Sequence, residues 1–120
     1  IHASPTRRDV SYFWHAAPRA YSKATGVELH IGRSIFRHLR ALPLEDIDVH
    51  LAHVDTIHTP RPTFAAIFTA WRDGYTEPTA KALGISEAEA RDYFDATIEC
   101  IQSPDGFALW VVPIWTARIR

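Results

Sequence analysis

The stretch Gly106-Phe-Ala-Leu-Trp-Val-Val-Pro-Ile-Trp-Thr-Ala-Arg-Ile-Arg120 decides the fold of this chain, because it predicts a β-strand that is apolar on both faces. A half-buried strand shows a polar residue at every second position, whereas this run shows none before Thr116. Such a strand needs covering layers above and below it. Only one other convincing strand precedes it in the sequence, so we expect the sheet to be incomplete within this chain.

Composition and charge limit the kinds of function. The chain has 120 residues, a formal net charge of −1 and scattered Lys and Arg, which argues against a nucleic-acid or acidic-membrane surface. No apolar run approaches the roughly 20 residues that span a bilayer, and no signal-peptide pattern opens the sequence. Cys100 is the only cysteine, so no internal disulfide can form and a cytoplasmic location fits best. Because Met is absent, even at position 1, we expect a chain that is trimmed, processed or cut from a longer protein.

Residues 1–42 predict an aromatic lead-in segment followed by two helices. Pro18 suits the first turn of a short helix that Gly26 ends, so the aromatic residues 12–15 are expected before that helix. The second helix, from about residue 30 to 41, has one apolar face and arginines on the others, which is typical of a surface helix.

The remainder predicts one more strand, three helices and the final strand, all within a single partial domain. Residues 43–59 contain a strand whose alternating pattern runs from Ile47 to Asp55. Residues 60–102 form a helical insertion, broken at Pro78 and reopened by a capping box at Ser86–Glu89. Residues 103–120 are a turn and the final strand. The predicted fold class is therefore α/β, with two strands and about five helices.

Two passages resemble the C-terminal half of a class I S-adenosylmethionine-dependent methyltransferase of the small-molecule type. The first is Gly26-Val-Glu-Leu-His-Ile-Gly-Arg33 with the helix and the strand that follow it. The second is the closing helix, the Pro-Asp-Gly turn and the strand as far as Arg118. The resemblance implies the C-terminal part of a Rossmann-like fold, with a helical insertion between the last two strands. It also implies that the final strand runs antiparallel between its neighbours, which would account for its two apolar faces.

The cofactor site of that family is missing from this sequence. The family builds the site from a Gly-rich turn after the first strand and an acidic residue at the end of the second strand. The five glycines of this chain are spread out and form no such turn. We therefore expect S-adenosylmethionine to be bound mainly by residues outside this chain. These residues would belong to a missing N-terminal half or a partner chain, and a homo- or hetero-oligomer stays open.

The resemblance places the substrate pocket in the aromatic lead-in segment and the helical insertion. The candidate substrate-binding residues are Tyr12, Trp14, Arg33, Trp71, Tyr75, Tyr93 and Phe94. Aromatic rings with polar tips suit a planar aromatic or heterocyclic molecule, since stacking supplies contact area and hydrogen bonds fix the orientation. For Trp71 and Phe94, which lie on apolar helical stripes, core packing is the alternative. Arg33 would hold an anionic group of the substrate or form a structural salt bridge.

Methyl transfer requires removal of a proton from the acceptor atom, and a neutral histidine can remove it. His15 and His58 are the preferred candidates for this base. His53, Asp55 and His58 also lie close together in the sequence, where a metal ion or a proton relay is conceivable. Their spacing does not match the common zinc signatures, so the sequence predicts no metal site.

The sequence thus predicts substrate binding and proton abstraction in the methylation of a small molecule of specialised metabolism, with neither nucleic acid nor membrane as a partner. Two other interpretations stay open. One is a noncatalytic subunit that pairs with a partner through an open sheet edge. The other is a small autonomous α+β isomerase or cyclase that uses a histidine base in an aromatic cavity.

Overall fold

The computed structural model describes all 120 residues, which form three strands and four helices. In chain order they are β1 (His2–Ser4), α1 (Val10–Thr25), α2 (Ile31–Arg40), β2 (Leu44–Asp55), α3 (Arg61–Leu83), α4 (Glu87–Gln102) and β3 (Phe107–Ile119). The strands form one antiparallel sheet in which β3 lies between β1 and β2. The predicted α/β class is confirmed, but the predicted two strands and about five helices are wrong.

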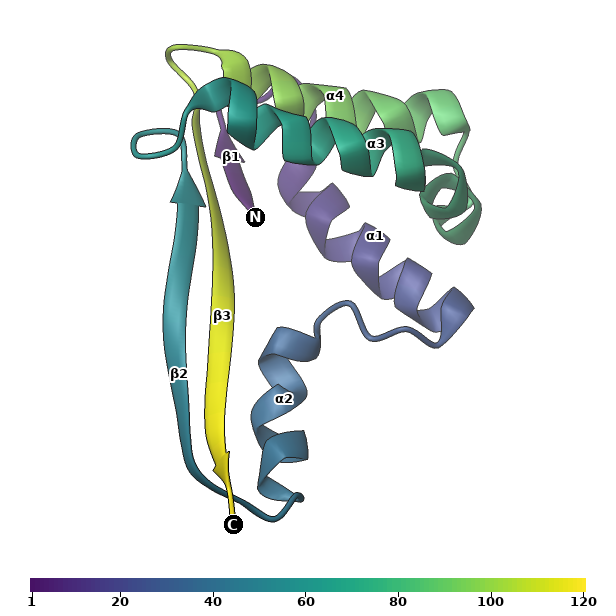
Figure 1. Ribbon diagram of the computed structural model, residues 1–120. Coiled ribbons are helices and arrows are strands. Elements are labelled where there is room, and N and C mark those ends of the chain that lie inside the picture. Colours follow the sequence, from purple (N-terminus) through teal and green to yellow (C-terminus); the bar gives the residue numbers. More distant parts are fainter.

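The long strands β2 and β3 form a two-stranded ribbon with helices at both of its ends (Figure 1). The α3–α4 hairpin lies across one end, and α2 lies beside the other. α1 runs diagonally from the hairpin toward α2 and packs against α3 and α4. The molecule is elongated, with extents of 49 × 35 × 20 Å.

The first helix starts earlier than the sequence predicts. α1 begins at Val10, so Tyr12 to His15 lie inside the helix and not before it. Asp9 caps its N-terminus by accepting a hydrogen bond from the Tyr12 N–H at 3.0 Å. The helix continues through Pro18 because one face buries Phe13 and other apolar residues, and tertiary packing overrides the local preference. Gly26 ends the helix in the left-handed conformation, as expected, with φ 76°.

The helical insertion contains two helices instead of three. α3 is continuous from Arg61 to Leu83, so the predicted break at Pro78 is wrong. Thr76, Thr79 and Ala80 are buried on either side of that proline, and their packing offsets the helix-breaking cost of about 3 kcal/mol. The predicted helix start at Ser86 is confirmed, since Ser86 Oγ accepts a hydrogen bond from the Glu89 N–H, but the second half of the capping box is not formed, because the Glu89 carboxylate contacts Arg8 at 3.4 Å.

The hydrophobic core lies where α1, α3 and α4 meet the start of β3. Its fully buried side chains include Val10, Phe64, Phe68 and Ile101, with Ala108 of β3 packed beside them. β1 joins this core through Ala3 and pairs with Phe107 to Leu109. Three residues are too few to show a strand periodicity, which is why the sequence did not predict β1.

Most of β3 has only one neighbouring strand. Beyond Leu109 its edge opposite β2 is unpaired. Val111 and Ile114, which point to opposite faces of the strand, are 47% and 48% exposed. The Trp115 indole N–H is buried and has no acceptor. The residues of this chain therefore cover the doubly apolar strand only in part, since Phe36 of α2 stacks on Trp115 at 5.8 Å while Val111 and Ile114 stay exposed.

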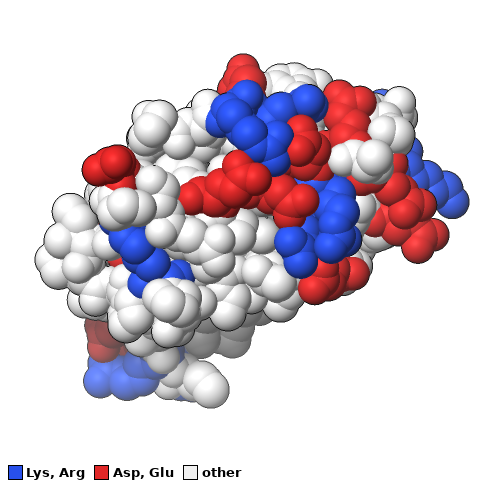
Figure 2. All heavy atoms as spheres, turned by 90° about the horizontal axis from the view of Figure 1, so that it is seen from above, with Lys and Arg blue, Asp and Glu red and all other residues white.

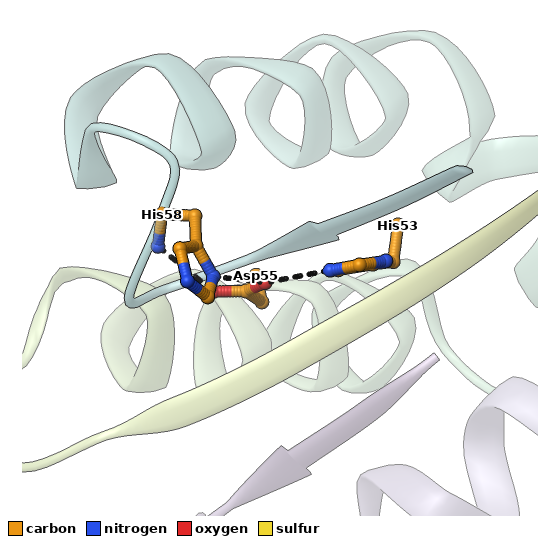
Figure 3. A group of neighbouring side chains, drawn as sticks. All are labelled: His53, Asp55 and His58. Atoms are coloured by element: carbon orange, nitrogen blue, oxygen red, sulfur yellow. Dashed lines mark hydrogen bonds and ion pairs between the residues drawn. The ribbon is translucent and has the colours of Figure 1, made fainter.

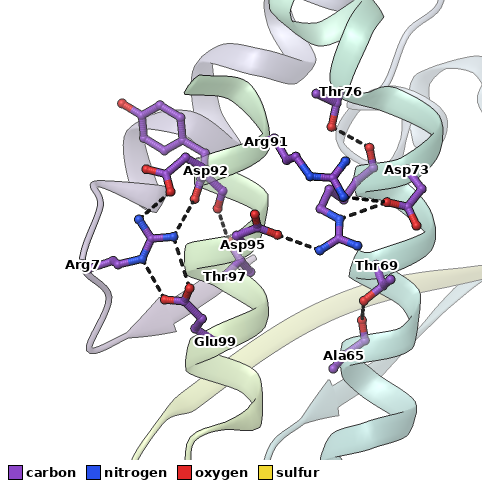
Figure 4. Close-up of polar contacts among 12 residues, drawn as sticks. Arg7, Ala65, Thr69, Asp73, Thr76, Arg91, Asp92, Asp95, Thr97 and Glu99 are labelled. Carbon is purple, nitrogen blue, oxygen red and sulfur yellow. Dashed lines mark hydrogen bonds and ion pairs between the residues drawn. The ribbon is translucent and has the colours of Figure 1, made fainter. Parts of the chain in front are cut away.

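Charged side chains of both signs lie next to one another on the face seen from above (Figure 2). Arg7 contacts Asp92 at 2.6 Å and Glu99 at 2.7 Å, which ties the segment before α1 to α4 (Figure 4). Arg72 on α3 contacts Asp95 on α4 at 2.7 Å. These contacts join the segment before α1 to α4 and α3 to α4. None of the helices combines the length and the apolar character needed to cross a membrane.

Candidate functional site

A cavity of about 450 Å³ lies between α1, α2, α3 and β3. This volume falls within the range of about 300–1,000 Å³ that is typical of small-molecule sites. Ten of the fourteen lining residues are hydrophobic, and the aromatic ones are Phe13, Trp14, Tyr21, Trp71, Tyr75, Phe94 and Trp110. The elements that form the cavity are far apart in sequence, so the fold alone brings these rings together.

The aromatic wall is held by contacts between rings. Trp71 lies edge-on to Trp110 at a centroid distance of 5.2 Å and to Phe68 at 5.0 Å. Trp14 lies edge-on to Phe94 at 5.4 Å, and its indole N–H donates a hydrogen bond to Thr97 at 3.0 Å. Edge-to-face pairs are favourable beyond the area that they bury, and the hydrogen bond satisfies the indole N–H. The wall is therefore preformed.

One side of the cavity is polar. His30 and Arg33 line the aromatic cavity and also a second hollow, whose other lining residues are Arg19, Ser22 and Glu28. Both residues come from the start of α2, since His30 occupies its N-cap position and Arg33 lies in its first turn. A planar molecule against the rings would therefore place a polar or anionic group beside Arg33, with Arg19 and Glu28 in the adjoining hollow.

His30 is suited to accept a proton. Burial, together with the nearby charge of Arg33, lowers the pKa of its imidazole below the ordinary value of 6.5. The ring is therefore neutral near pH 7, which is the protonation state that a general base requires.

Most of the predicted substrate-binding residues line this cavity. Trp14, Arg33, Trp71, Tyr75 and Phe94 are among its walls. Tyr12 is not, since its side chain points from α1 into solvent and is 56% exposed. Tyr93 is not either, because its ring stacks on Phe13 at 4.8 Å and lies under the Arg8 guanidinium at 4.2 Å.

Neither predicted base lines the cavity. His15 lies on the exposed side of α1, where its Nε2 is 3.0 Å from Arg19 Nη1. His58 lies in the turn between β2 and α3, and its side chain is 74% exposed. The structure thus separates both histidines from the aromatic wall.

His58 instead joins His53 and Asp55 in a cluster at the C-terminal end of β2 (Figure 3). His58 Nδ1 lies 2.9 Å from Asp55 Oδ2, and His53 Nε2 lies 3.6 Å from the same oxygen. His53 and Asp55 are two positions apart in β2 and therefore point to the same face of the strand, which explains the second contact. Hydrogen bonds from the side chain and backbone N–H of His58 hold the pKa of the Asp55 carboxyl at about 2.

Sequence reasoning did not identify His30, Tyr21 and Trp110 as cavity residues. His30 lies in the turn before α2, where no periodicity shows which way a side chain points, and Trp110 is one of several apolar residues in a run that gives no sign of which one lines a site. One feature of the sequence could have indicated a role for His30 in the site, which is its position directly before the helix that starts with Ile31-Gly32-Arg33. The arrangement can bind a planar molecule, hold an anionic group and accept a proton.

No family model matches the chain, and no curated protein or solved structure is significantly similar to it.

Proposed function

We propose that this chain is the substrate-binding half of an S-adenosylmethionine-dependent methyltransferase that acts on a small aromatic or heterocyclic molecule. The observation that carries the proposal is the aromatic cavity with His30 and Arg33 on its polar side. A preformed wall of rings supplies stacking area, and the two polar groups supply orientation and a base. We further assign the substrate an anionic group, because Arg33 and Arg19 both line the neighbouring hollow, where Glu28 is the one acidic residue.

The order of the strands supports the proposal. β3 runs antiparallel between β1 and β2, and the α3–α4 hairpin connects β2 to β3. This is the order that the resemblance implies for the last strands of a class I methyltransferase. The unpaired edge of β3 beyond Leu109 supports a further segment beside it.

The residues of this chain do not fit the cofactor. No Gly-rich turn follows a strand here, because Gly26 and Gly84 end helices, Gly32 and Gly74 lie inside helices, and Gly106 closes a turn. S-adenosylmethionine, bound by residues outside this chain, would supply an electrophilic methyl group. The residues present here would bind the substrate ring, hold its anionic group and take up the acceptor proton.

We assign the proton acceptor to His30, in preference to His15 or His58, because only His30 lines the cavity. In the proposed reaction the acceptor N–H or O–H gives its proton to the neutral imidazole, which releases it to water after the product leaves. His30→Gln should therefore lower kcat of the completed enzyme by about 100-fold or more, whereas His15→Gln and His58→Gln should change it little.

Binding of a matched pair of ligands tests the cavity directly. 2-Naphthoate and 2-naphthamide have the same ring system, and only the first is anionic. Titrations followed by NMR should show tighter binding of the naphthoate, and Arg33→Gln should remove this preference. Arg37→Gln changes an exposed arginine of the same helix that does not line the cavity, and should leave the preference intact. Equal binding of both ligands by the unchanged chain would contradict an anion site.

Calorimetry with S-adenosylmethionine tests whether residues outside this chain bind the cofactor. The isolated chain should give no binding heat, whereas the chain together with the segment that completes its sheet should bind the cofactor. Cofactor binding by the isolated chain would contradict the proposal. An intact-mass measurement on the native protein would show whether that segment belongs to the same polypeptide.

The unpaired edge of β3 also favours a second candidate, a noncatalytic subunit that pairs with a partner strand. Both candidates predict a partner beside β3, but they differ in the cofactor. A stable complex that never binds S-adenosylmethionine would favour the noncatalytic subunit.

A further inference from the structure

The His53–Asp55–His58 cluster lies at the end of β2, and none of its residues lines the aromatic cavity. We propose that this cluster is a binding site for a divalent transition-metal ion, with Zn²⁺ as the best match. Its donors are two imidazole nitrogens and one carboxylate oxygen, the ligand set of many zinc sites. The site goes beyond the proposed methyltransferase function and does not depend on it.

The distances between the donor atoms suit one small ion. One ligand atom from each residue lies within 4.8 Å of the other two. Asp55 Oδ2 is 2.9 Å from His58 Nδ1 and 3.6 Å from His53 Nε2. Two ligands of a tetrahedral zinc ion with bonds of about 2.0–2.1 Å are about 3.3 Å apart, which lies between these two separations. The exposed rings of His53 and His58, whose centroids are 6.3 Å apart, would rotate toward Asp55 Oδ2 when the ion binds.

The carboxylate is fixed by the protein. The Asp55 side chain is buried, and its Oδ1 accepts hydrogen bonds from the N–H groups of Ile57 at 2.8 Å and His58 at 2.9 Å. Such outer contacts orient a metal ligand and are a regular feature of metal sites. They leave Oδ2 to face the two rings.

Both imidazole rings are accessible to an ion from the solvent. Their side chains are 59% exposed for His53 and 74% exposed for His58. In the ion-free chain His58 Nδ1 donates a proton toward Asp55 (Figure 3). The ion would take the place of that proton at Nδ1, and the neutral ring of His58 would change tautomer and carry its single proton on Nε2. Three protein ligands leave the fourth position on the solvent side for water or a side chain of another molecule.

Calorimetric titration of the full chain with ZnCl₂ tests the site. We expect one Zn²⁺ per chain, and we expect His53→Gln and Asp55→Asn each to weaken the affinity by at least about tenfold. His50→Gln is the matched control, since His50 is also an exposed histidine of β2 but lies outside the cluster. Its affinity should equal that of the unchanged chain.

Two further readouts separate a metal site from a purely structural Asp–His hydrogen bond. Co²⁺ should give the intense visible absorption of a tetrahedral complex, and Zn²⁺ should raise the melting temperature of the unchanged chain but not of His53→Gln. Because His53 is mostly exposed, this variant should fold without the metal. The proposal is wrong if no Zn²⁺ binds, or if His50→Gln weakens binding as much as His53→Gln. It is also wrong if only Asp55→Asn and His58→Gln affect the affinity.

Discussion

Trp14 Nε1 donates a hydrogen bond to Thr97 Oγ1 over 3.0 Å, and this contact joins α1 to α4 inside the protein. Thr97 is fully buried, while Trp14 forms part of the cavity wall. The same hydrogen bond therefore holds two helices together and fixes a ring against which the proposed substrate would stack.

Thr97→Val keeps the shape of the side chain but removes the acceptor. We expect a loss of about 1–3 kcal/mol in the free energy of unfolding, because the partly buried indole N–H is left without its protein partner. Urea denaturation measures this loss. Thr69→Val is the control, since the Thr69 hydroxyl bonds only to the Ala65 carbonyl of its own helix, at 3.0 Å. Equal losses in both variants would show that the hydrogen bond between the helices adds nothing.

Gly106 has no room for a side chain. A Cβ at this position would collide with the carbonyl group of Cys100 at the end of α4. Gly106→Ala should therefore destabilise the chain by about 1–3 kcal/mol or more. Gly74→Ala offers the opposite case, because Gly74 lies inside α3 with open space around its Cβ position. It should stabilise the chain by about 0.5–1 kcal/mol, and denaturation curves that fail to move in opposite directions would contradict this account.

Asp55 should make stability fall in acid. Its hydrogen bonds lower the carboxyl pKa from 3.8 to about 2, so the stabilisation is present above pH 3.8 and disappears as the pH falls through about 2. Urea midpoints between pH 5 and pH 2 should drop less for Asp55→Asn than for the unchanged chain. Asp105→Asn, at an exposed position in the turn before β3, should keep the original pH dependence. A parallel drop in all three proteins would refute the assignment.

Arg61 holds the end of α4 and the turn that follows it. Its Nη1 donates to the carbonyl oxygens of Ile101 at 2.8 Å and Gly106 at 2.9 Å, and its Nη2 donates to that of Pro104 at 3.3 Å. A lysine cannot reproduce this fork, so Arg61→Lys should cost about 1–3 kcal/mol in thermal or urea unfolding. Arg37→Lys, at an exposed position of α2, should stay within about 0.5 kcal/mol of the unchanged chain.

The parts of the fold that depend on neighbouring residues were predictable from the sequence. The Ser86 cap, the Gly26 helix end and the alternating strand that ends at Asp55 each have a signal within a few positions. The early start of α1 and the unbroken helix through Pro78 depend on packing between distant segments. A single sequence carries no local trace of that packing, and propensity alone then favours the wrong boundary.

In the candidate site, too, the residues with a signal in the sequence were predictable, and those placed by packing between distant segments were not. The resemblance led to Trp14, Trp71 and Arg33, which the fold brings to one cavity. It did not lead to His30, because the direction of a loop histidine depends on how α2 packs. His53 and Asp55 followed from strand alternation, whereas the approach of His58 depends on the turn that reverses the chain after β2.

The short length of β1 has a consequence for the motions of β3. Peptide hydrogens that point toward β1 have a partner strand only from Phe107 to Leu109, and those that point the same way farther along β3 have none. The unpaired peptide hydrogens should exchange with deuterium quickly, through small local fluctuations. The hydrogens that bond to β2 should exchange slowly, because they are released only when β2 and β3 separate. One strand should thus alternate between fast and slow exchange at successive residues, and docking of a completing strand should abolish that alternation.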